Sequence, residues 1–458
     1  GEKYIETFAV NPEGDGLTWT LPAKDQIHLG PYDLVLDIYL DGKLLEHYYY
    51  RKAFSLYQSA KGTINTGQYQ AGATVNLLSV GEFYHFMTGE VINTPDEEDI
   101  TSDSRNLLKF KDRDGSDGMG YVILRKNKTF AEQVIYTNTI YEIRYEFDLS
   151  SDTVNIPSGC ALDFHGGEIS NGELVFNDTL LRGDVKLSCD VSGNIKNEYV
   201  DITWLGAKSD TISASAFDSL PAIQKAIDWM TDYYPKHIFI PAGNFGVSDS
   251  ILLSNKYNNI IIEGLSPDAT TIFAIQSMES LITRRAGEAG QGTFCRPNIS
   301  NICLCGDNTG RSVLPDITTI PSVCEYGINL PFFGYCYMEN VHFRRFSKIA
   351  LYIADSYNAH YNRLDFHTCQ NGMAIISNIN GVSVTNSEFG GIKGFGLYSF
   401  NGSSLNIRDN VFEGMEHTAI IIFAASNVNI EDNYFEDCCF MPITVKDANG
   451  NTEPKQVY

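Results

Sequence analysis

Five stretches of the sequence end in a phenylalanine every 23 residues: CYMENVHF (336–343), AHYNRLDF (359–366), VSVTNSEF (382–389), LNIRDNVF (405–412) and VNIEDNYF (428–435). Apolar residues also recur in all five copies seven and five positions before this phenylalanine and eight positions after it. A period of about 20–50 residues is typical of solenoids, propellers and arrays, and propeller blades need about 40–45. Each copy here holds short alternating apolar segments separated by Asn, Asp and Gly. The repeat therefore predicts an all-β fold, a parallel β-helix with 23 residues per coil.

The phenylalanines of the repeat are expected to form one buried column, because equivalent residues of successive coils stack about 4.8 Å apart. Asparagines recur near one turn of the copies. Asn tolerates the left-handed backbone conformation and can form ladders of amide hydrogen bonds from coil to coil. We expect such ladders at Asn340, Asn386, Asn410 and Asn433.

The N-terminal part of the chain predicts a different kind of β-structure. Apolar residues alternate over 34–40, Asp41-Gly42 is a hairpin-turn signal, and a tyrosine-rich return strand follows over 44–54. We therefore predict a small antiparallel β domain, a linker, a β-rich transition region and the β-helix at residues 1–60, 61–103, 104–200 and 201–458.

One helix is predicted to cap the β-helix, between Ser219 and Pro235. Ser219 suits the N-cap position and Pro221 suits the first turn. Three apolar residues share one face of this helix: Ile223, Ile227 and Met230.

Composition excludes several classes of function. The 458 residues include 33 Lys and Arg against 57 Asp and Glu, a net charge of −24. This charge argues against nucleic-acid binding and against docking on an anionic membrane, because both need a basic face. No stretch approaches the ~18 consecutive apolar residues that membrane insertion requires. The ten cysteines are scattered without C-x₂-C pairs, so we expect buried thiols and neither a disulfide framework, a metal site nor a cofactor.

Residues 203–264 carry a second pattern: TWLGAKSD (203–210), PAIQKAIDWM (221–230), HIFIPAGNFGVSDSILL (237–253) and NNIIIEG (258–264). A Gly-Ala-x-x-Asp motif, a helix, an IPAG-like strand and a strand that ends in Glu-Gly follow one another. This order resembles the entry to the pectate-lyase-like right-handed β-helix superfamily. The resemblance implies a right-handed β-helix over residues 200–458, but it says little about function, because the superfamily holds lyases, hydrolases, epimerases and non-catalytic spikes.

Two upstream stretches carry a narrower resemblance: LLKFKDRDGSDGMGYVILRKN (107–127) and NTIYEIRYEFDLSSDTVNIPSGCALDFHGGEISNGELVFNDTLLRG (138–183). They are similar to the region before the β-helix in tail-fibre or tailspike proteins of phages and prophages of gut Bacteroides. Residues 1–60 are similar to the adaptor-like domains of such proteins. The resemblance implies a virion-tail or extracellular protein that binds, and in some cases cleaves, a bacterial surface polysaccharide as a homotrimer.

The two ends of the sequence add one expectation. The chain begins with Gly1, so its natural N-terminus is not visible. Only a polar tail follows Val445, and a β-helix has an open last coil that needs a cap. We therefore expect either a longer natural chain or a homo-oligomer.

Two columns of the repeat are expected to face solvent, because they flank the inward phenylalanine. One column holds His342, Asp365, Glu388, Val411 and Tyr434, and the other holds Arg344, His367, Gly390, Glu413 and Glu436. We predict that these columns form one patch, with Gly390-Gly391 as open space within it. The predicted catalytic residues are Asp365, Glu388, His367, His342 and Glu413.

Glycoside cleavage needs two carboxyl groups, and Asp365 and Glu388 on adjacent coils are the predicted pair. Two carboxylates stacked one coil apart raise each other's pKa, which favours one protonated acid. An Arg and two His also suit binding of a uronate and lyase chemistry, so hydrolase and lyase both remain open. A solvated face of an acidic protein would collect the same residue types, so a patch without chemistry remains open as well.

The predicted substrate-binding residues are Arg344, Arg363, Tyr361, Gly390 and Gly391. Several tyrosines have the chemistry to stack on sugar rings or to serve as partly buried wall residues: Tyr335, Tyr337, Tyr352, Tyr357, Tyr361 and Tyr398. DRDGSDG (112–118) resembles the start of a calcium loop, but Ile123 stands where the bidentate Glu belongs. The motifs of polygalacturonases and of calcium-dependent pectate lyases are not recognisable.

The sequence thus predicts a tailspike- or tail-fibre-like protein that binds, and in one interpretation cleaves, a surface polysaccharide. One alternative is a non-catalytic structural or glycan-binding fibre segment. A second alternative is a free bacterial polysaccharide lyase or glycoside hydrolase.

Overall fold

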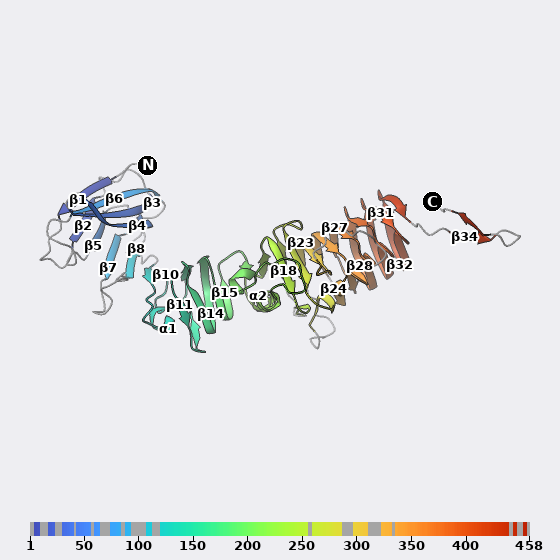
Figure 1. Ribbon diagram of the computed structural model, residues 1–458, viewed down its shortest axis with the longest axis horizontal. Helices are drawn as coiled ribbons and strands as arrows, with labels where there is room; N and C mark the ends of the chain where they lie inside the picture. The colour runs from blue at the N-terminus through green and yellow to red at the C-terminus, as the bar shows by residue number, and fades with distance from the viewer. Residues whose placement is uncertain are drawn as a thin grey trace. The chain divides into compact units, whose positions relative to one another are not determined.

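The computed structural model describes residues 122–254, 259–285, 296–309, 322–330 and 335–438 in full, and elsewhere only the backbone of the strands named below. The chain is an all-β right-handed β-solenoid of about 12 turns with roughly 23 residues per coil, as predicted. It divides into two compact units, Gly1–Val185 and Lys186–Tyr458 (Figure 1).

The first unit begins with antiparallel structure. Its four-stranded sheet has the order β1-β6-β3-β4, with bounds Tyr4–Ala9, Thr74–Phe83, Gly30–Leu40 and Lys43–Ser55. The predicted hairpin is confirmed, because β3 and β4 pair antiparallel across 41–42. A second antiparallel pair joins β2 (Leu17–Pro22) to β5 (Ser59–Ile64). Strand β6 lies in the segment predicted as a linker, and the acidic stretch 94–103 lies outside the described residues.

The rest of the first unit changes to parallel pairing. Strand β10 pairs parallel with β9 and with β13, and β13 pairs parallel with β14. Its elements are β7 (Thr88–Ile92), β8 (Leu107–Lys111), β9 (Gly120–Ile123), α1 (Phe130–Gln133), β10 (Thr139–Ile143), β11 (Glu146–Asp148), β12 (Thr153–Asn155), β13 (Ala161–Phe164) and β14 (Glu168–Gly183). The calcium-loop-like segment 112–118 lies outside the described residues.

The second unit contains the predicted helix. Helix α2 (Leu220–Asp232) buries Ile223, Ile227 and Met230, which confirms the predicted face. Ser219 occupies the N-cap position, but its hydroxyl bonds the backbone of Lys208, donating to the carbonyl oxygen at 3.0 Å and accepting from N–H at 3.1 Å. Neither α-helix of the described residues has the length and hydropathy needed to cross a bilayer.

Short parallel strands surround and follow this helix. They are β15 (Leu187–Ile195), β16 (Val200–Asp201), β17 (His237–Ile240), β18 (Gly243–Val247), β19 (Ile251–Leu253), β20 (Ile261–Gly264), β21 (Thr270–Ala274), β22 (Met278–Arg284), β23 (Asn298–Cys305) and β24 (Cys324–Pro331), with the 3₁₀ helix η2 (Ile202–Leu205) after β16. Strands β17, β18 and β19 pair in register with β20, β21 and β22 of the next coil.

The 23-residue repeat forms the regular part of the solenoid. Its strands are β25 (Tyr337–Arg344), β26 (Ile349–Ala354), β27 (His360–His367), β28 (Met373–Thr385), β29 (Glu388–Gly390), β30 (Leu397–Arg408), β31 (Val411–Met415), β32 (Ile420–Glu431) and β33 (Tyr434–Cys438). One side stacks β25, β27, β29, β31 and β33, and another stacks β26, β28, β30 and β32. An antiparallel pair, β34 (Ile443–Lys446) and β35 (Thr452–Lys455), follows in the sequence.

The phenylalanine column is confirmed. Phe343, Phe366, Phe389 and Phe412 are fully buried, and their stacked rings have centroids 4.8, 4.7 and 4.6 Å apart. Phe435 continues the stack at 5.2 Å but is 50% exposed. The prediction of complete burial was therefore wrong for Phe435, which lies on β33, the terminal strand of its sheet.

The turn asparagines also form the predicted ladders. Asn410 is buried, and its Nδ2 donates to Oδ1 of Asn433 at 2.9 Å and to the carbonyl oxygen of Val384 at 3.0 Å. On the outside of the same turn, Asn340 Nδ2 donates to Asn301 Oδ1 at 2.9 Å. One column of this turn has positive φ in every coil: Asn340, Arg363, Asn386, Asp409 and Asp432.

Candidate functional site

The predicted patch exists as one outward side of the regular coils. We call the outward side of β25, β27, β29, β31 and β33 the polar face. His342 pairs with Asp365, which pairs with Glu388. The next column pairs Arg344 with His367, His367 with Gly390, and Gly390 with Glu413. The parallel register therefore places all five predicted catalytic residues on one outward side but spreads them over four coils: Asp365, Glu388, His367, His342 and Glu413.

Asp365 is bound by Arg344 through both carboxylate oxygens. Nη1 of Arg344 donates to Oδ1 at 2.9 Å, and Nη2 donates to Oδ2 at 2.5 Å. Both side chains are about three-quarters buried. Burial disfavours the charged guanidinium, but the hydrogen bonds with Asp365 outweigh it and raise the pKa of Arg344. The two groups neutralise each other, so neither is available as a free charge.

His342 lies beside this ion pair. Its Nδ1 is 3.3 Å from Nη2 of Arg344, and its Nε2 is 3.8 Å from Oδ2 of Asp365. Burial and then the positive charge of Arg344 lower the pKa of His342, and Asp365 offsets this only in part. His342 is therefore neutral at pH 7, which suits acceptance of a hydrogen bond from Arg344 rather than donation of a proton to a substrate.

Gly390 of β29 follows His367 in the outward column of Arg344 and is itself buried. A Cβ atom on Gly390 would stand 3.3 Å from Cδ2 of His367, closer than ordinary van der Waals contact, and 3.6 Å from Oε1 of Glu388. Glu413, on β31 of the next coil, pairs with Gly390. We call this position, with His367, Glu388 and Glu413 around it, the Gly390 notch.

The groups around the notch are not committed to other partners. Nδ1 of His367 is 2.6 Å from Oγ1 of Thr368, which fixes the ring and leaves Nε2 toward the notch. Among the described residues, neither Nε2 of His367 nor the carboxylate of Glu388 or Glu413 forms a hydrogen bond or ion pair. A Cβ atom on Gly391 would lie 3.9 Å from Cε1 of His367 and from the backbone nitrogen of Thr368, which is ordinary van der Waals contact.

Tyr361 requires a correction. It was predicted to bind substrate, but it is fully buried. Its hydroxyl is 3.3 Å from Oγ of Ser356, and burial raises its pKa well above the ordinary value. Tyr361 stands in the inward column five residues before the repeat phenylalanine, so it cannot touch a ligand on the polar face.

Arg363 lies in the turn column and not on the polar face. Its side chain is 60% exposed and forms an ion pair with Glu339. The hydrogen bond from Tyr337 and then that from Arg363 lower the pKa of Glu339. The structure therefore does not bring Arg363 to the Gly390 notch.

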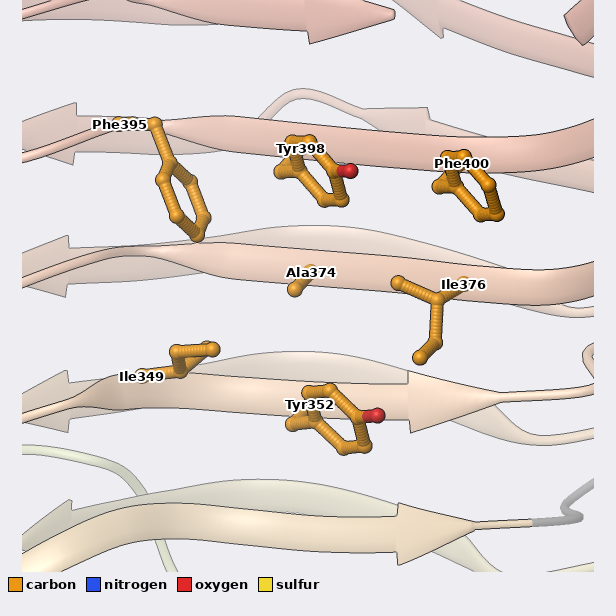
Figure 2. A pocket seen from close by; sticks show the side chains of 7 residues that line it. All are labelled: Ile349, Tyr352, Ala374, Ile376, Phe395, Tyr398 and Phe400. Carbon is orange, nitrogen blue, oxygen red and sulfur yellow. The ribbon is translucent and has the colours of Figure 1, made fainter. Parts of the chain in front are cut away.

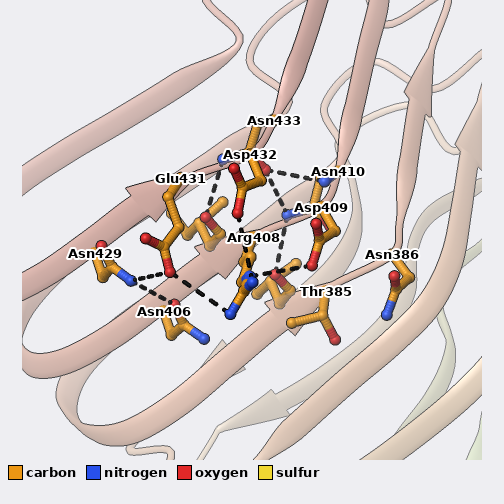
Figure 3. Close-up of polar contacts among 12 residues, drawn as sticks. Thr385, Asn386, Asn406, Arg408, Asp409, Asn410, Asn429, Glu431, Asp432 and Asn433 are labelled. Carbon is orange, nitrogen blue, oxygen red and sulfur yellow. Dashed lines mark hydrogen bonds and ion pairs between the residues drawn. The ribbon is translucent and has the colours of Figure 1, made fainter.

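A second group of carboxylates surrounds Arg408, at the same turn in later coils (Figure 3). Its guanidinium is 3.2 Å from Asp409, 3.7 Å from Glu431 and 3.4 Å from Asp432. These side chains are about half exposed. Each carboxylate faces the same cation, so this group resembles a solvated ion network more than a reactive site.

The cysteines of the described residues are free thiols. Burial raises the pKa of Cys303, Cys324 and Cys369 to about 12, which keeps these thiols protonated. No three His, Cys, Asp or Glu side chains within the described ranges come close enough to hold a metal ion.

The sequence patterns did not predict a hollow on another side of the same coils. We call the outward side of β26, β28, β30 and β32 the aromatic face. The hollow has a volume of about 360 Å³, and Figure 2 shows its lining: Ile349, Tyr352, Ala374, Ile376, Phe395, Tyr398 and Phe400. Tyr352 and Tyr398 are among the predicted stacking tyrosines. The apolar column eight residues after the phenylalanine was wrong at Ala374, because the register pairs Leu351 with Met373 and places Ala374 between Tyr352 and Tyr398.

Comparisons with known proteins bear on the fold. A family model described as the right-handed β-helix region matches residues 311–455. No curated protein matches the sequence. Among solved structures, ORF18 of Geobacillus virus E2 aligns at 14% identity and a TM-score of 0.29, over 53% of this chain and 62% of the viral chain. The chain thus spans less than two thirds of that protein.

Two enzymes of known structure also align with this chain at low identity and low TM-score. The catalytic unit of a GH87 α-1,3-glucanase from Streptomyces thermodiastaticus aligns at 10% identity and a TM-score of 0.34, over 95% of this chain and 74% of the enzyme. The A-module of the mannuronan C-5 epimerase AlgE4 from Azotobacter vinelandii aligns at 17% identity and a TM-score of 0.26, over 51% of this chain and 76% of the module. At such TM-scores the shapes differ, so the activities of these proteins say nothing about this chain.

Proposed function

We propose that this chain binds a surface polysaccharide and cleaves it by hydrolysis at the Gly390 notch. The observation that carries the proposal is the notch itself. His367 and Glu388 adjoin the glycine on an outward face, and Glu413 pairs with it from the next coil. Within the described residues, Nε2 of His367 and the carboxylates of Glu388 and Glu413 form no hydrogen bond or ion pair.

Hydrolysis of a glycoside needs one carboxyl group as acid and a second as base or nucleophile. Glu388 on β29 and Glu413 on β31 are the two uncommitted carboxylates on adjacent strands. We assign them this role in place of the pair Asp365 and Glu388, because Asp365 is held by Arg344. His367 serves as a third group that can transfer a proton or hold a sugar hydroxyl.

The state of Arg344 favours a hydrolase over a lyase. A lyase must neutralise the carboxylate of a uronate before it removes the neighbouring proton. The guanidinium of Arg344 is already neutralised by Asp365, and the other charged groups at the notch are acidic. A neutral sugar chain therefore suits the notch better than a polyuronate.

A second candidate function is glycan binding without cleavage. The aromatic face favours it, because exposed aromatic rings suit contact with sugar rings. Phe400 and Phe423 are 37% and 61% exposed and stack with centroids 5.4 Å apart.

The biological setting is a narrower part of the proposal. The resemblance of the upstream stretches supports a tailspike- or fibre-like protein of a phage or prophage, acting on the virion tail or outside the cell. It also supports a homotrimer. Light scattering of the purified chain should give three times the mass of one chain, and a monomer at high concentration would contradict the trimer.

The function is tested by the products formed from bacterial surface polysaccharides. We expect new reducing ends without the ultraviolet absorbance of unsaturated uronates, whereas absorbance would indicate a lyase. Gly390→Leu should abolish the release, because its side chain fills the notch and displaces His367, whose Cδ2 would lie 3.3 Å from the new Cβ atom. Release of neither product from any polysaccharide that the chain binds would overturn cleavage and leave the binding function.

A further inference from the structure

The hollow on the aromatic face interrupts a column of aromatic rings. Tyr352 pairs with Ala374, and Ala374 pairs with Tyr398, so the three residues occupy equivalent positions of successive coils. Figure 2 shows the two tyrosine rings in the same orientation, one on each side of Ala374. The small side chain of Ala374 therefore leaves a gap between the two rings.

The phenylalanine column inside these coils shows what the coil spacing allows. Its buried rings stack with centroids 4.6–4.8 Å apart. Tyr352 and Tyr398 are two coils apart, about 9.5 Å at the usual strand spacing. The gap above Ala374 therefore has the thickness of one ring, and a ring placed there would contact both tyrosines.

The lining selects a ring with apolar faces and a polar edge. Apart from the two phenol oxygens, the lining side chains are hydrocarbon. Neither the Tyr352 nor the Tyr398 hydroxyl forms a hydrogen bond with any described residue, and in Figure 2 both point the same way. A hexopyranose with only equatorial substituents matches this lining, because axial C–H groups cover both of its faces and hydroxyls surround its edge.

We propose that this hollow, the Ala374 slot, binds one all-equatorial, β-linked glucose-type unit of a polysaccharide between Tyr352 and Tyr398. Its volume of about 360 Å³ lies within the ~300–1,000 Å³ range of small-ligand sites. The lining carries no charge, so a neutral sugar fits it and a uronate gains nothing there. The inference rests on the proposed glycan binding and places a second contact on a different side of the coils from the Gly390 notch.

Titration calorimetry with two oligosaccharides tests the slot. Cellohexaose and β-1,4-mannohexaose share length and linkage, but mannose carries an axial hydroxyl that makes one face polar. We expect cellohexaose to bind more tightly. Tyr352→Ala and Tyr398→Ala should each weaken its binding by about 2- to 10-fold, whereas Tyr352→Phe keeps the ring and should change it less. Equal affinities, or no binding of either sugar, would overturn the proposal.

Filling the gap is the sharper test. Ala374→Phe should place a ring in the slot and abolish cellohexaose binding, with a melting temperature equal to or above that of the wild type. Unchanged affinity would overturn the slot. So would a fall in the oligomeric state of Tyr398→Ala in light scattering without any effect on sugar binding, which would make the aromatic face a contact between copies of this chain.

The outcomes separate the slot from the notch. Glu146→Gln, at an exposed residue of β11 in the first unit, is the control that should leave cellohexaose binding unchanged. Absence of cellohexaose binding in a chain that still cleaves polysaccharide would remove the slot alone. Cellohexaose binding in a chain that cleaves nothing would support the slot and remove the catalytic function.

Discussion

The polar face and the aromatic face are built on the same coils but carry opposite chemistry. On the polar face, Gly390 separates His367 from Glu413. On the aromatic face, Ala374 separates Tyr352 from Tyr398. In both columns a small residue interrupts a row of larger side chains. The repeat thus fixes the inward columns, while each outward side acquires its own character where the repeat is broken.

The largest expected effect is on the rate of polysaccharide cleavage at the polar face. Glu388→Gln should reduce polysaccharide cleavage by about 10²- to 10⁴-fold, the usual value of a general acid or base. The melting temperature should stay near that of the wild type, because Glu388 is exposed and has no partner among the described residues. The matched control is Glu146→Gln, an exposed glutamate of β11 in the first unit, which should cleave normally. Full activity of Glu388→Gln would move the site away from the notch.

The next effect concerns the interior that both faces share. Phe389→Ala should reduce the free energy of unfolding by about 3–5 kcal/mol, because it removes a buried ring from the middle of the stack. Since coils contact mainly their neighbours, the loss should concentrate in the adjoining coils and disturb both faces. Urea unfolding and hydrogen exchange measure it. A loss below ~0.5 kcal/mol, typical of surface sites, would contradict the packed column.

A smaller effect distinguishes the two arginine–carboxylate groups. Asp365→Asn leaves the largely buried Arg344 without its counter-charge and should cost about 1–3 kcal/mol. Asp409→Asn, at the exposed Arg408, should cost less than ~1 kcal/mol. Urea unfolding of the two variants compares them directly. Equal losses would show that the burial of Arg344 does not matter.

The smallest effect is a pH dependence from His342. Its pKa is lower in the folded chain than in the unfolded chain, so the unfolded chain binds the proton first as the pH falls. The resulting stability is complete above the unfolded value of about 6.5 and declines below it. His342→Gln should therefore lose less stability between pH 7 and pH 5 than the wild type. An identical pH dependence would contradict the burial of His342 beside Arg344.

The fold was predictable because the inward columns obey one simple rule. A buried position in a regular coil must be apolar or, like Asn410, must have hydrogen-bond partners, and the 23-residue spacing of Phe343 to Phe412 shows the apolar case directly. The same rule predicts that Tyr361 is buried, because its column also contains Met338, Val384 and Ile407. Its hydroxyl suggested a ligand contact, but the column predicted burial, and the column was right.

The candidate sites were only partly predictable, because outward positions follow no shared rule. The register placed Arg344 and Asp365 near each other, but the sequence does not say that two long side chains will close on one another rather than on a ligand. The aromatic hollow depends on the absence of a large side chain at Ala374. The gap at a small residue can be recognised only when the side chains of the neighbouring coils are placed on both sides of it.

The even rise of the solenoid has a consequence for a long ligand. Successive coils lie about 4.8 Å apart, and an extended sugar chain advances by a similar step for each unit. On an uninterrupted face such a chain would find the same surroundings at every coil and could slide from one to the next. The outward residues of this solenoid differ from coil to coil, and Gly390 and Ala374 are small where their neighbours in the column are large, so we expect them to hold a periodic ligand in a single register.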